Sequence, residues 1–296
     1  MYEAYYNLAE KPFSILPDPE FIYWGRAHSM AFAMLEYGIM NHAGFTVITG
    51  EIGCGKTTLI RHLLNRLEDN ITVGLVTNTP KNSDELLQWI MMSLNQPVNY
   101  SSYVELYQHF ETFIIGEYAK GRRTVLIIDE AQNLKPDTLE ELRMLSNLNA
   151  DKSQLLQLVL VGQPELKDLL QRPELVQFAQ RVSSDFHLRH LLHSEVIDYI
   201  NHRLWVAGRQ TALFTQDACE LIAKASNGIP RIINILCDTA LIYGFSWEAP
   251  LITRDIVHDV IKDKSEFGIF AADDDMNNDK EAGTNDKKNI VQIASI

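Results

Sequence analysis

The chain has 296 residues, of which 46% are hydrophobic and 22% charged, as in a globular protein long enough for two structural units. No apolar run is long enough to cross a bilayer, no signal peptide is recognisable at the start, and three widely spaced cysteines form no metal-ligand pattern. The formal net charge of −13 opposes non-specific adsorption to nucleic acid or anionic lipid, and we expect a cytoplasmic location.

The first part of the chain contains two predicted elements. Residues 1–26 place aromatic side chains between prolines, which excludes a regular helix and predicts an extended segment packed over the core. The following residues, His28 to Met40, repeat apolar side chains at helical spacing and predict a first helix. We group residues 1–40 as an N-terminal segment.

Strands and helices then alternate up to residue 190. Strands are predicted at 45–49, 72–77, 124–129, 156–161 and 183–188, and those at 124–129 and 156–161 are almost wholly apolar. Helices are predicted between them at 59–67, 84–94, 104–120 and 136–148 and within 164–181. This alternation is typical of an α/β fold, in which helices flank a parallel sheet, and we assign it to a domain of residues 41–190.

Only helices are predicted after residue 190. They lie at 194–207, 215–226, 230–247 and 253–262, and they predict a small all-helical domain over residues 191–263. The remaining residues, 264–296, are rich in Asp, Asn and Lys, so we expect a disordered acidic tail.

A glycine-rich loop follows the first strand and has the spacing of a Walker A phosphate loop. Its glycines would let main-chain N–H groups point at phosphate oxygens, and the start of the next helix adds its positive end. Lys56 would reach the β- and γ-phosphates, and the Thr57 hydroxyl would hold Mg²⁺. The alternative is a glycine turn that binds nothing. The residues predicted to contact the nucleotide are Gly50, Glu51, Ile52, Gly53, Cys54, Gly55, Lys56, Thr57 and Thr58.

Two carboxylates, Asp129 and Glu130, come at the end of the strand predicted at 124–129. A nucleotide site needs one carboxylate to hold the Mg²⁺ waters and a second to orient the attacking water. Asp129 fits the first role and Glu130 the second. An acidic pair alone is a weak signal, because solvated carboxylates often end strands, but downstream of a Walker A loop it is a strong one. The two motifs together predict an ATP hydrolase that uses ATP and Mg²⁺.

These motifs, together with Gly162–Leu166 and Gly228–Arg231, resemble those of AAA+ ATPases, and in particular of the ExeA/GspA-type secretion ATPases. Some members of that family are stand-alone forms linked to pilus or exopolysaccharide export. Pro12-Phe13, Pro17-Asp18-Pro19 and Gly44-Phe45 also match the family's opening, so the resemblance covers roughly residues 1–262. It implies a P-loop NTPase fold in which the C-terminal helices form a lid.

The resemblance also implies roles for residues outside the two motifs. Gln163 would be the sensor that contacts the γ-phosphate or the attacking water, although a polar residue that merely ends a strand is the alternative. Arg231, at the start of a helix, would be the second sensor and reach back across the nucleotide. Arg181 would be the arginine finger that neutralises γ-phosphate charge in a neighbouring subunit's site. Arg172 is the rival candidate, and either arginine could be a plain surface residue.

Two further assignments complete the predicted site, of which the first is implied by the resemblance. Asn78, at the end of the second predicted strand, would hold Glu130 inactive until a partner binds. An aromatic such as Tyr23, Phe21 or His28 would line the adenine pocket, although aromatic residues at this spacing usually pack in a core.

The family pattern predicts an ATPase that forms a homo-oligomer when nucleotide is bound and rearranges a partner complex of an envelope export or pilus system. The secretion relatives often continue into a membrane span and a cell-wall-binding domain. Neither is recognised here, so we expect any association with the inner membrane to be peripheral and to run through partners. The alternatives are a DNA-binding ATPase of the transposition-regulator type, which the acidic charge opposes, and a nucleotide-gated scaffold, which the intact Asp129–Glu130 pair opposes.

Overall fold

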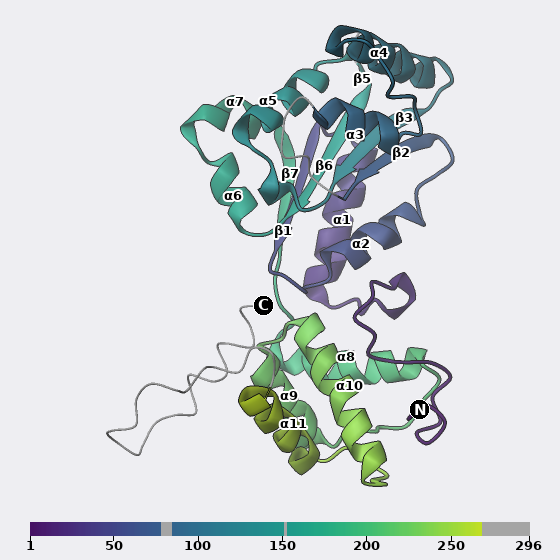
Figure 1. Cartoon of the computed structure of the whole chain (residues 1–296), viewed down its shortest axis with the longest axis vertical. Helices are drawn as coiled ribbons and strands as arrows, with labels where there is room; N and C mark the ends of the chain where they lie inside the picture. Colours follow the sequence, from purple (N-terminus) through teal and green to yellow (C-terminus); the bar gives the residue numbers. More distant parts are fainter. Residues whose placement is uncertain (78–84, 151–152, 268–296) are drawn as a thin grey trace. The chain divides into compact units, whose positions relative to one another are not determined.

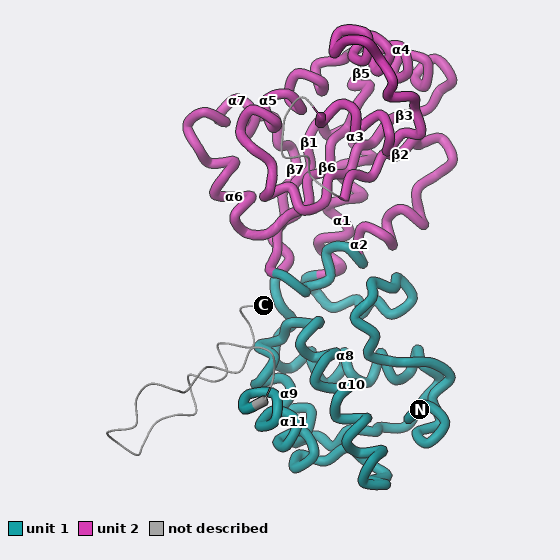
Figure 2. The backbone as a smooth tube through the Cα atoms, in the orientation of Figure 1, with its two compact units in different colours: residues 1–27, 52–58, 189–296 teal, residues 28–51, 59–188 magenta. Residues whose placement is uncertain are grey.

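The computed structural model describes residues 1–77, 85–150 and 153–267, which form two compact units (Figure 2). The helical unit contains residues 1–27, 52–58 and the described residues from 189 onward, and the sheet unit contains 28–51 and the described residues of 59–188. The predicted N-terminal segment of residues 1–40 is thus divided, since residues 1–27 and the loop 52–58 group with the C-terminal helices, whereas residues 28–40 group with the sheet. Asn78 and residue 84, the first of the helix predicted at 84–94, lie outside the described residues.

Five parallel strands form the sheet, in the order β2-β3-β6-β1-β7 (Figure 1). Their bounds are β1 (Phe45–Gly50), β2 (Ile71–Val76), β3 (Arg123–Ile128), β6 (Leu156–Gly162) and β7 (Val182–Leu188). Every residue of β1 and β6 is buried, as expected for central strands that are covered on both faces. The predicted parallel α/β fold is therefore confirmed.

Helices cover both faces of the sheet. Successive residues of a strand point to opposite faces, and the central strands carry side chains on both faces that are buried under these helices. Phe45, Leu126 and Leu158 pack in one hydrophobic core with residues of α3 to α7. On the other face, the side-chain N–H of Gln157 donates to the carbonyl of Ile39 in α1 at 3.1 Å. The helices concerned are α1 (Arg26–Met40), α3 (Leu86–Ser93), α4 (Tyr103–Ala119), α5 (Pro136–Leu145), α6 (Glu165–Leu170) and α7 (Val176–Ala179).

Short elements that the sequence did not predict connect the longer ones. Two antiparallel strands, β4 (Asn149–Ala150) and β5 (Ser153–Gln154), form a small separate sheet. Single 3₁₀ turns lie at η1 (Pro19–Phe21), η3 (Ala131–Asn133) and η4 (Pro173–Leu175). Elements of two or three residues are too short to show a hydrophobic period, so the sequence does not indicate them.

The helical unit contains four helices from the C-terminal part of the chain, as predicted. They are α8 (His193–Val206), α9 (Gln216–Ser226), α10 (Pro230–Ser246) and α11 (Arg254–Phe267). The last helix therefore continues beyond the predicted end at 262, and the rest of the predicted acidic tail lies outside the described residues. None of the helices in the described part of the chain is long and apolar enough to span a bilayer.

The aromatic N-terminal segment completes the hydrophobic core of the helical unit. Tyr2, Tyr6, Phe13 and Phe21 are all buried in that core. Arg203 of α8 fixes the segment, since its guanidinium lies 4.8 Å from the centre of the Phe21 ring and donates hydrogen bonds to the carbonyls of Pro12 and Ser14. The predicted packing of this segment over a core therefore occurs on the C-terminal helices.

Candidate functional site

The Walker A loop joins β1 to α2 (Lys56–Leu64). Gly53 and Gly55 have φ angles of +79° and +99°, in the left-handed region that glycine adopts without strain. α2 begins at Lys56, so the N–H groups at the helix start come directly after the glycines. The backbone is thus of the kind that phosphate loops require, and the nucleotide contacts of residues 50–58 stay a prediction.

Within the helical unit, Gly53 lies directly against the start of α10. The main-chain N–H of Arg231 donates to the carbonyl oxygen of Gly53 at 3.1 Å. A Cβ atom on Gly53 would lie 2.6 Å from the Cβ atom of Arg231, which is closer than two carbon atoms can pack. The structure thus brings the loop and the predicted second sensor together through their main chains. The Arg231 side chain itself is exposed, and its role toward a nucleotide stays a prediction.

The predicted catalytic carboxylates follow β3 at the carboxyl edge of the sheet. Asp129 is buried, and its main-chain N–H donates to the carbonyl of Val76 at the end of the neighbouring strand β2 at 2.9 Å. The Asp129 Oδ1 atom accepts the main-chain N–H of Glu130 at 2.9 Å. Glu130 is partly exposed and has a left-handed backbone, with φ +54° and ψ +36°. Two hydrogen bonds and a left-handed backbone therefore fix the positions of both residues. A carboxylate that merely ends a strand in solvent would not need them.

Two glutamines hold the Glu130 carboxylate. The side-chain N–H groups of Gln132 and Gln163 donate to the same oxygen, Oε2, at 2.6 and 3.2 Å. The side-chain oxygen of Gln132 in turn accepts the main-chain N–H of Gln163 at 3.0 Å. The structure therefore brings Gln163, the predicted first sensor, together with Glu130. Gln132 follows Glu130 by two residues, and neither a role for it nor its link to β6 was predicted.

The residues predicted to hold Mg²⁺ offer a carboxylate, from Asp129, and a hydroxyl, from Thr57. These are the oxygen donors that Mg²⁺ prefers, and Mg²⁺ usually takes few protein ligands beside phosphates and water. Among the described residues, no group of three or more His, Cys, Asp or Glu side chains could hold a metal by itself. The donor chemistry therefore suits an ion that is bound together with a nucleotide.

The predicted arginine finger lies apart from the carboxylates. Arg181 precedes β7, whose first residue, Val182, pairs with Phe45 at the beginning of β1, so Arg181 lies at the amino edge of the sheet. Its exposed guanidinium donates to the side-chain oxygens of Asn147 at 2.5 Å and Ser146 at 3.3 Å. Arg172, the rival candidate, is exposed and lies 3.8 Å from a carboxylate oxygen of Glu174. Glu130, Gln132 and Gln163 form a hydrogen-bonded group that we call the Glu130 cluster. These partners of the two arginines in their own chain do not belong to this cluster.

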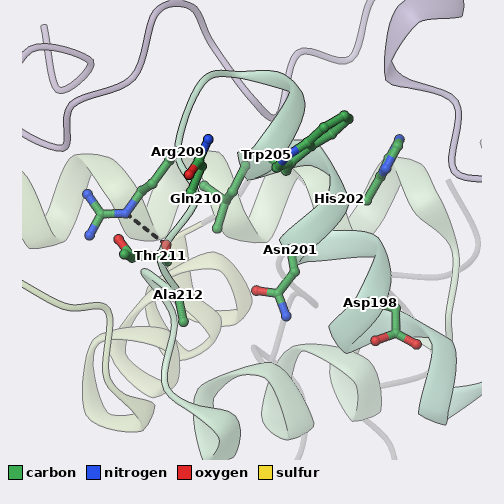
Figure 3. Close-up of a pocket in the computed structure, with 9 residues that line it drawn as sticks. Asp198, Asn201, His202, Trp205, Arg209, Gln210, Thr211 and Ala212 are labelled. Atoms are coloured by element: carbon green, nitrogen blue, oxygen red, sulfur yellow. Dashed lines mark hydrogen bonds between the residues drawn. The ribbon is translucent and has the colours of Figure 1, made fainter.

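The predicted adenine-pocket residue Tyr23 packs against α8 in the helical unit. Its ring makes an edge-to-face contact with Tyr199, with ring centres 6.1 Å apart, and burial raises the pKa of its hydroxyl. A hollow of about 460 Å³ lies along α8 and the segment that follows it (Figure 3). Trp205 and Arg209 line this hollow, but none of the predicted site residues does. It is therefore distinct from the predicted nucleotide site.

Comparison with known proteins places these features in a family. Residues 39–170 match the model of the AAA domain. The chain is 40% identical over 247 residues to the general secretion pathway protein A of Aeromonas hydrophila. That alignment covers 83% of this chain but 45% of the relative, so the chain spans less than half of the relative's length.

Solved structures agree in fold. The Cdc6p protein of Pyrobaculum aerophilum has a TM-score of 0.64 at 18% identity, with 82% of this chain and 70% of that one covered. The RuvB Holliday junction branch migration motor of Thermotoga maritima has a TM-score of 0.53 at 22% identity, with 84% and 73% covered. Likeness at such low identity shows the fold alone, whereas the sequence relative carries the family. The chain belongs to the AAA+ ATPases, as an ExeA/GspA-like member.

Proposed function

We propose that the chain binds ATP with Mg²⁺, hydrolyses the ATP, and uses the cycle to rearrange a partner complex in envelope secretion or export. One observation carries the proposal. A glutamate carboxylate that follows the central strand β3 is held by two glutamine amides and stands beside a buried aspartate. Such an arrangement suits a group that must orient a water molecule repeatedly in one direction.

Each part of the site has its own task in this proposal. The N–H groups of the Walker A loop bind the phosphates, and Lys56 neutralises charge on the β- and γ-phosphates. Thr57 and Asp129 hold Mg²⁺, which when bound supplies positive charge at the phosphate oxygens. Glu130 orients the attacking water, and Gln163 turns from Glu130 toward the γ-phosphate or that water. Tyr23 and Arg231 contact the nucleotide from the helical unit.

Arg181 acts on a neighbouring subunit in this proposal. Its position at the amino edge of the sheet, away from the Glu130 cluster of its own chain, supports a role in trans. An arginine finger is worth about 10³-fold or more in rate in related phosphoryl transfer. The proposed enzyme is therefore a homo-oligomer when nucleotide is bound.

The similarity to the general secretion pathway protein A favours protein partners of an export system. Because the chain spans 45% of that relative, the relative's partners are not carried over from it directly. The alternative of a DNA-binding regulator gains nothing from the Cdc6p and RuvB structures, whose identities of 18% and 22% indicate a shared fold alone. The net charge of −13 still opposes it.

The test compares wild-type protein with Glu130→Gln. Wild-type protein is expected to bind a fluorescent ATP analogue only with Mg²⁺ and to release phosphate from ATP. Glu130→Gln is expected to bind with the same affinity and to hydrolyse at least about 100-fold more slowly, because it lacks the water-orienting carboxylate. The matched control is Glu68→Gln, an exposed site in the same unit. The proposal fails if Mg²⁺ does not affect nucleotide binding. An unchanged rate of ATP hydrolysis in Glu130→Gln would show that another residue orients the water.

The same variant identifies the partner class. Glu130→Gln saturated with ATP is expected to form an oligomer, detectable by mass measurement with and without nucleotide, and to retain proteins of an export complex during purification. A gel-shift assay with duplex DNA and ATP at several salt concentrations tests the alternative, because DNA binding would weaken steeply with salt.

A further inference from the structure

We propose that Gln132 is a positioning residue for the water-orienting carboxylate of Glu130. This inference rests on the proposed function and adds to it the group that holds the base in place. The acidic motif predicted a role for Glu130 and the resemblance to secretion ATPases one for Gln163, whereas Gln132 had none. Its place in the structure, between the ends of β3 and β6, gives it one.

The contacts of Gln132 fix the orientation of its amide. The main-chain N–H of Gln163 can only donate a hydrogen bond, so the Gln132 atom 3.0 Å from it must be the carbonyl oxygen, Oε1. The other end of the amide is then the –NH₂ group, which lies 2.6 Å from Glu130 Oε2 and donates to it. The side chain cannot rotate by 180° without losing both contacts. Gln132 therefore presents a fixed donor to the carboxylate.

The end of β6 has the shape that this bridge needs. A Cβ atom on Gly162 would lie 2.8 Å from Gln132 Oε1 and 2.9 Å from Leu166 Cδ2. Both distances are shorter than real Cβ atoms show, so glycine at this position leaves room for the Gln132 amide to cross the end of the strand. Gln132 thus ties the loop after β3 to β6 while it holds Glu130.

Gln132 and Gln163 differ in how firmly they hold the carboxylate. The amide of Gln132 is held at both ends, with a distance of 2.6 Å to Glu130. The side-chain amide of Gln163 lies farther from the same oxygen, at 3.2 Å. Gln163 can therefore turn toward a γ-phosphate while Gln132 continues to hold Oε2. The second oxygen of the carboxylate, Oε1, is then aimed by Gln132 at the water.

The test uses two substitutions that separate positioning from structural support. Gln132→Met keeps the size of the side chain and removes the amide. Gln132→Glu keeps an oxygen that can accept the Gln163 N–H but places a second carboxylate against Glu130. If Gln132 positions Glu130, both variants lower kcat by about 10- to 100-fold, while the KM for ATP and the affinity for Mg²⁺-ATP stay within about twofold of wild type. If Gln132 only supports the fold, a folded Gln132→Met variant keeps the wild-type kcat, whereas the added negative charge lowers kcat in Gln132→Glu in either case.

The controls cover folding and coupling. Gln177→Met places the same substitution at an exposed position of α7 in the same unit and is expected to leave kcat unchanged. In a Glu130→Gln background, the Gln132→Met change is expected to lower the single-turnover rate by less than about twofold, because the group through which Gln132 acts is already gone. If Gln132→Met does not fold, as judged by thermal melting, Gln132→Leu, which also lacks the amide, takes its place.

The outcomes separate this inference from the function on which it rests. A folded Gln132→Met variant with the wild-type kcat, or equal losses in the presence and absence of the Glu130 carboxylate, overturns the positioning role and leaves the ATPase proposal standing. Wild-type protein that shows no Mg²⁺-dependent turnover overturns the ATPase proposal, and the positioning role falls with it.

Discussion

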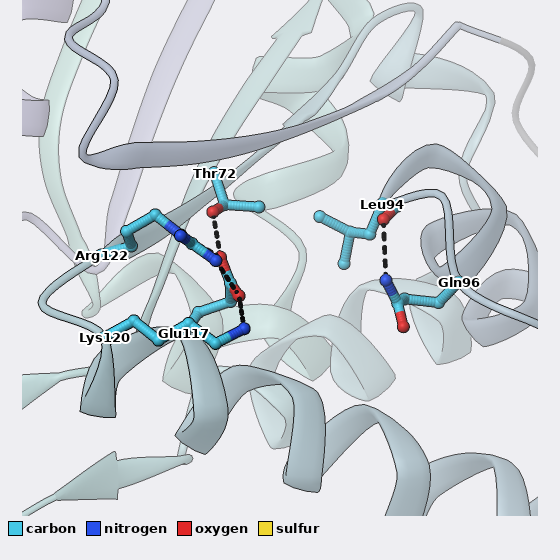
Figure 4. A network of polar contacts seen from close by, with 6 residues as sticks. All are labelled: Thr72, Leu94, Gln96, Glu117, Lys120 and Arg122. Carbon is cyan, nitrogen blue, oxygen red and sulfur yellow. Dashed lines mark hydrogen bonds and ion pairs between the residues drawn. The ribbon is translucent and has the colours of Figure 1, made fainter.

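Glu117 of α4 anchors the amino edge of the sheet and gives a pH-dependent prediction. Its buried carboxylate accepts hydrogen bonds from the Thr72 hydroxyl at 2.5 Å, from Lys120 at 3.0 Å, and from two Arg122 nitrogens at 2.6 Å each (Figure 4). The hydrogen bonds to Arg122 are the largest cause, with those to Thr72 and Lys120 adding to it, and they lower the pKa of Glu117 from 4.5 to about 2. The ionised form is therefore favoured in the folded chain.

The size of the effect follows from that difference in pKa. About 2.5 pKa units correspond to roughly 3 kcal/mol at 1.36 kcal/mol per unit. The side chains of Arg122 and Lys120 are 38% and 60% exposed, so water screens part of the interaction. We therefore expect Glu117→Gln to lower the free energy of unfolding by about 1–2 kcal/mol at pH 7. A loss of that size should lower the Tm of the sheet unit by about 2–8 °C.

The pH dependence has a definite sign. Because the folded pKa lies below the unfolded one, the stabilisation by Glu117 is complete above about pH 4.5 and disappears as the pH falls toward about 2. Urea unfolding at several pH values, followed by the fluorescence of Trp89 after replacement of the other tryptophans by Phe, reports on the sheet unit. The difference in the free energy of unfolding between wild type and Glu117→Gln should disappear as the pH falls from about 4.5 toward about 2. An advantage that stays constant with pH would refute the assignment, and Glu111→Gln on the same helix is the control.

Two further predictions concern the loop and the arginines. Gly53→Ala should raise the Kd for Mg²⁺-ATP at least about tenfold, because the new Cβ meets Arg231 at 2.6 Å. Gly121→Ala shares the positive φ but has open space around its Cβ, so equal effects of the two variants would contradict the steric argument. Arg181→Ala should lower kcat by about 10³-fold and leave nucleotide affinity unchanged, and should regain part of its turnover when mixed with Glu130→Gln subunits, which can supply the arginine. If Arg172→Ala behaves this way instead, the arginine finger is Arg172.

The sheet could be predicted from the sequence because most of its strands are short apolar runs that are recognisable without knowledge of the residues packed against them. The apolar run of β3 is buried on both faces and is followed by Asp129, so strand and carboxylate were recognisable without knowledge of the neighbours. The loop was predicted for the same reason, since the positive φ angles at Gly53 and Gly55 require the residue type that the motif contains. The family resemblance then supplied expected roles for further residues such as Gln163, and the structure brings Gln163 together with Glu130 of the acidic motif.

Contacts between distant segments carried no such local signal. The bridge between Gln132 and the main chain of Gln163 joins residues 31 positions apart, and its trace in the sequence is one glutamine two places after Glu130. The packing of the N-terminal aromatics was recognised as necessary, yet the sequence did not indicate which part of the chain would cover them. That depends on tertiary contacts such as the cation–π contact between Arg203 and Phe21.

The backbone of Glu130 favours a working residue over a solvated end of a strand. Its left-handed conformation costs about 1 kcal/mol in a residue other than glycine, and surrounding contacts must compensate for it. Glu248 shares this conformation, but it comes shortly after α10, where left-handed residues commonly end helices. Glu130 instead follows a strand, and hydrogen bonds to Asp129, Gln132 and Gln163 hold it there. A carboxylate that only met water would gain nothing from these constraints, whereas one that must aim a water molecule depends on them.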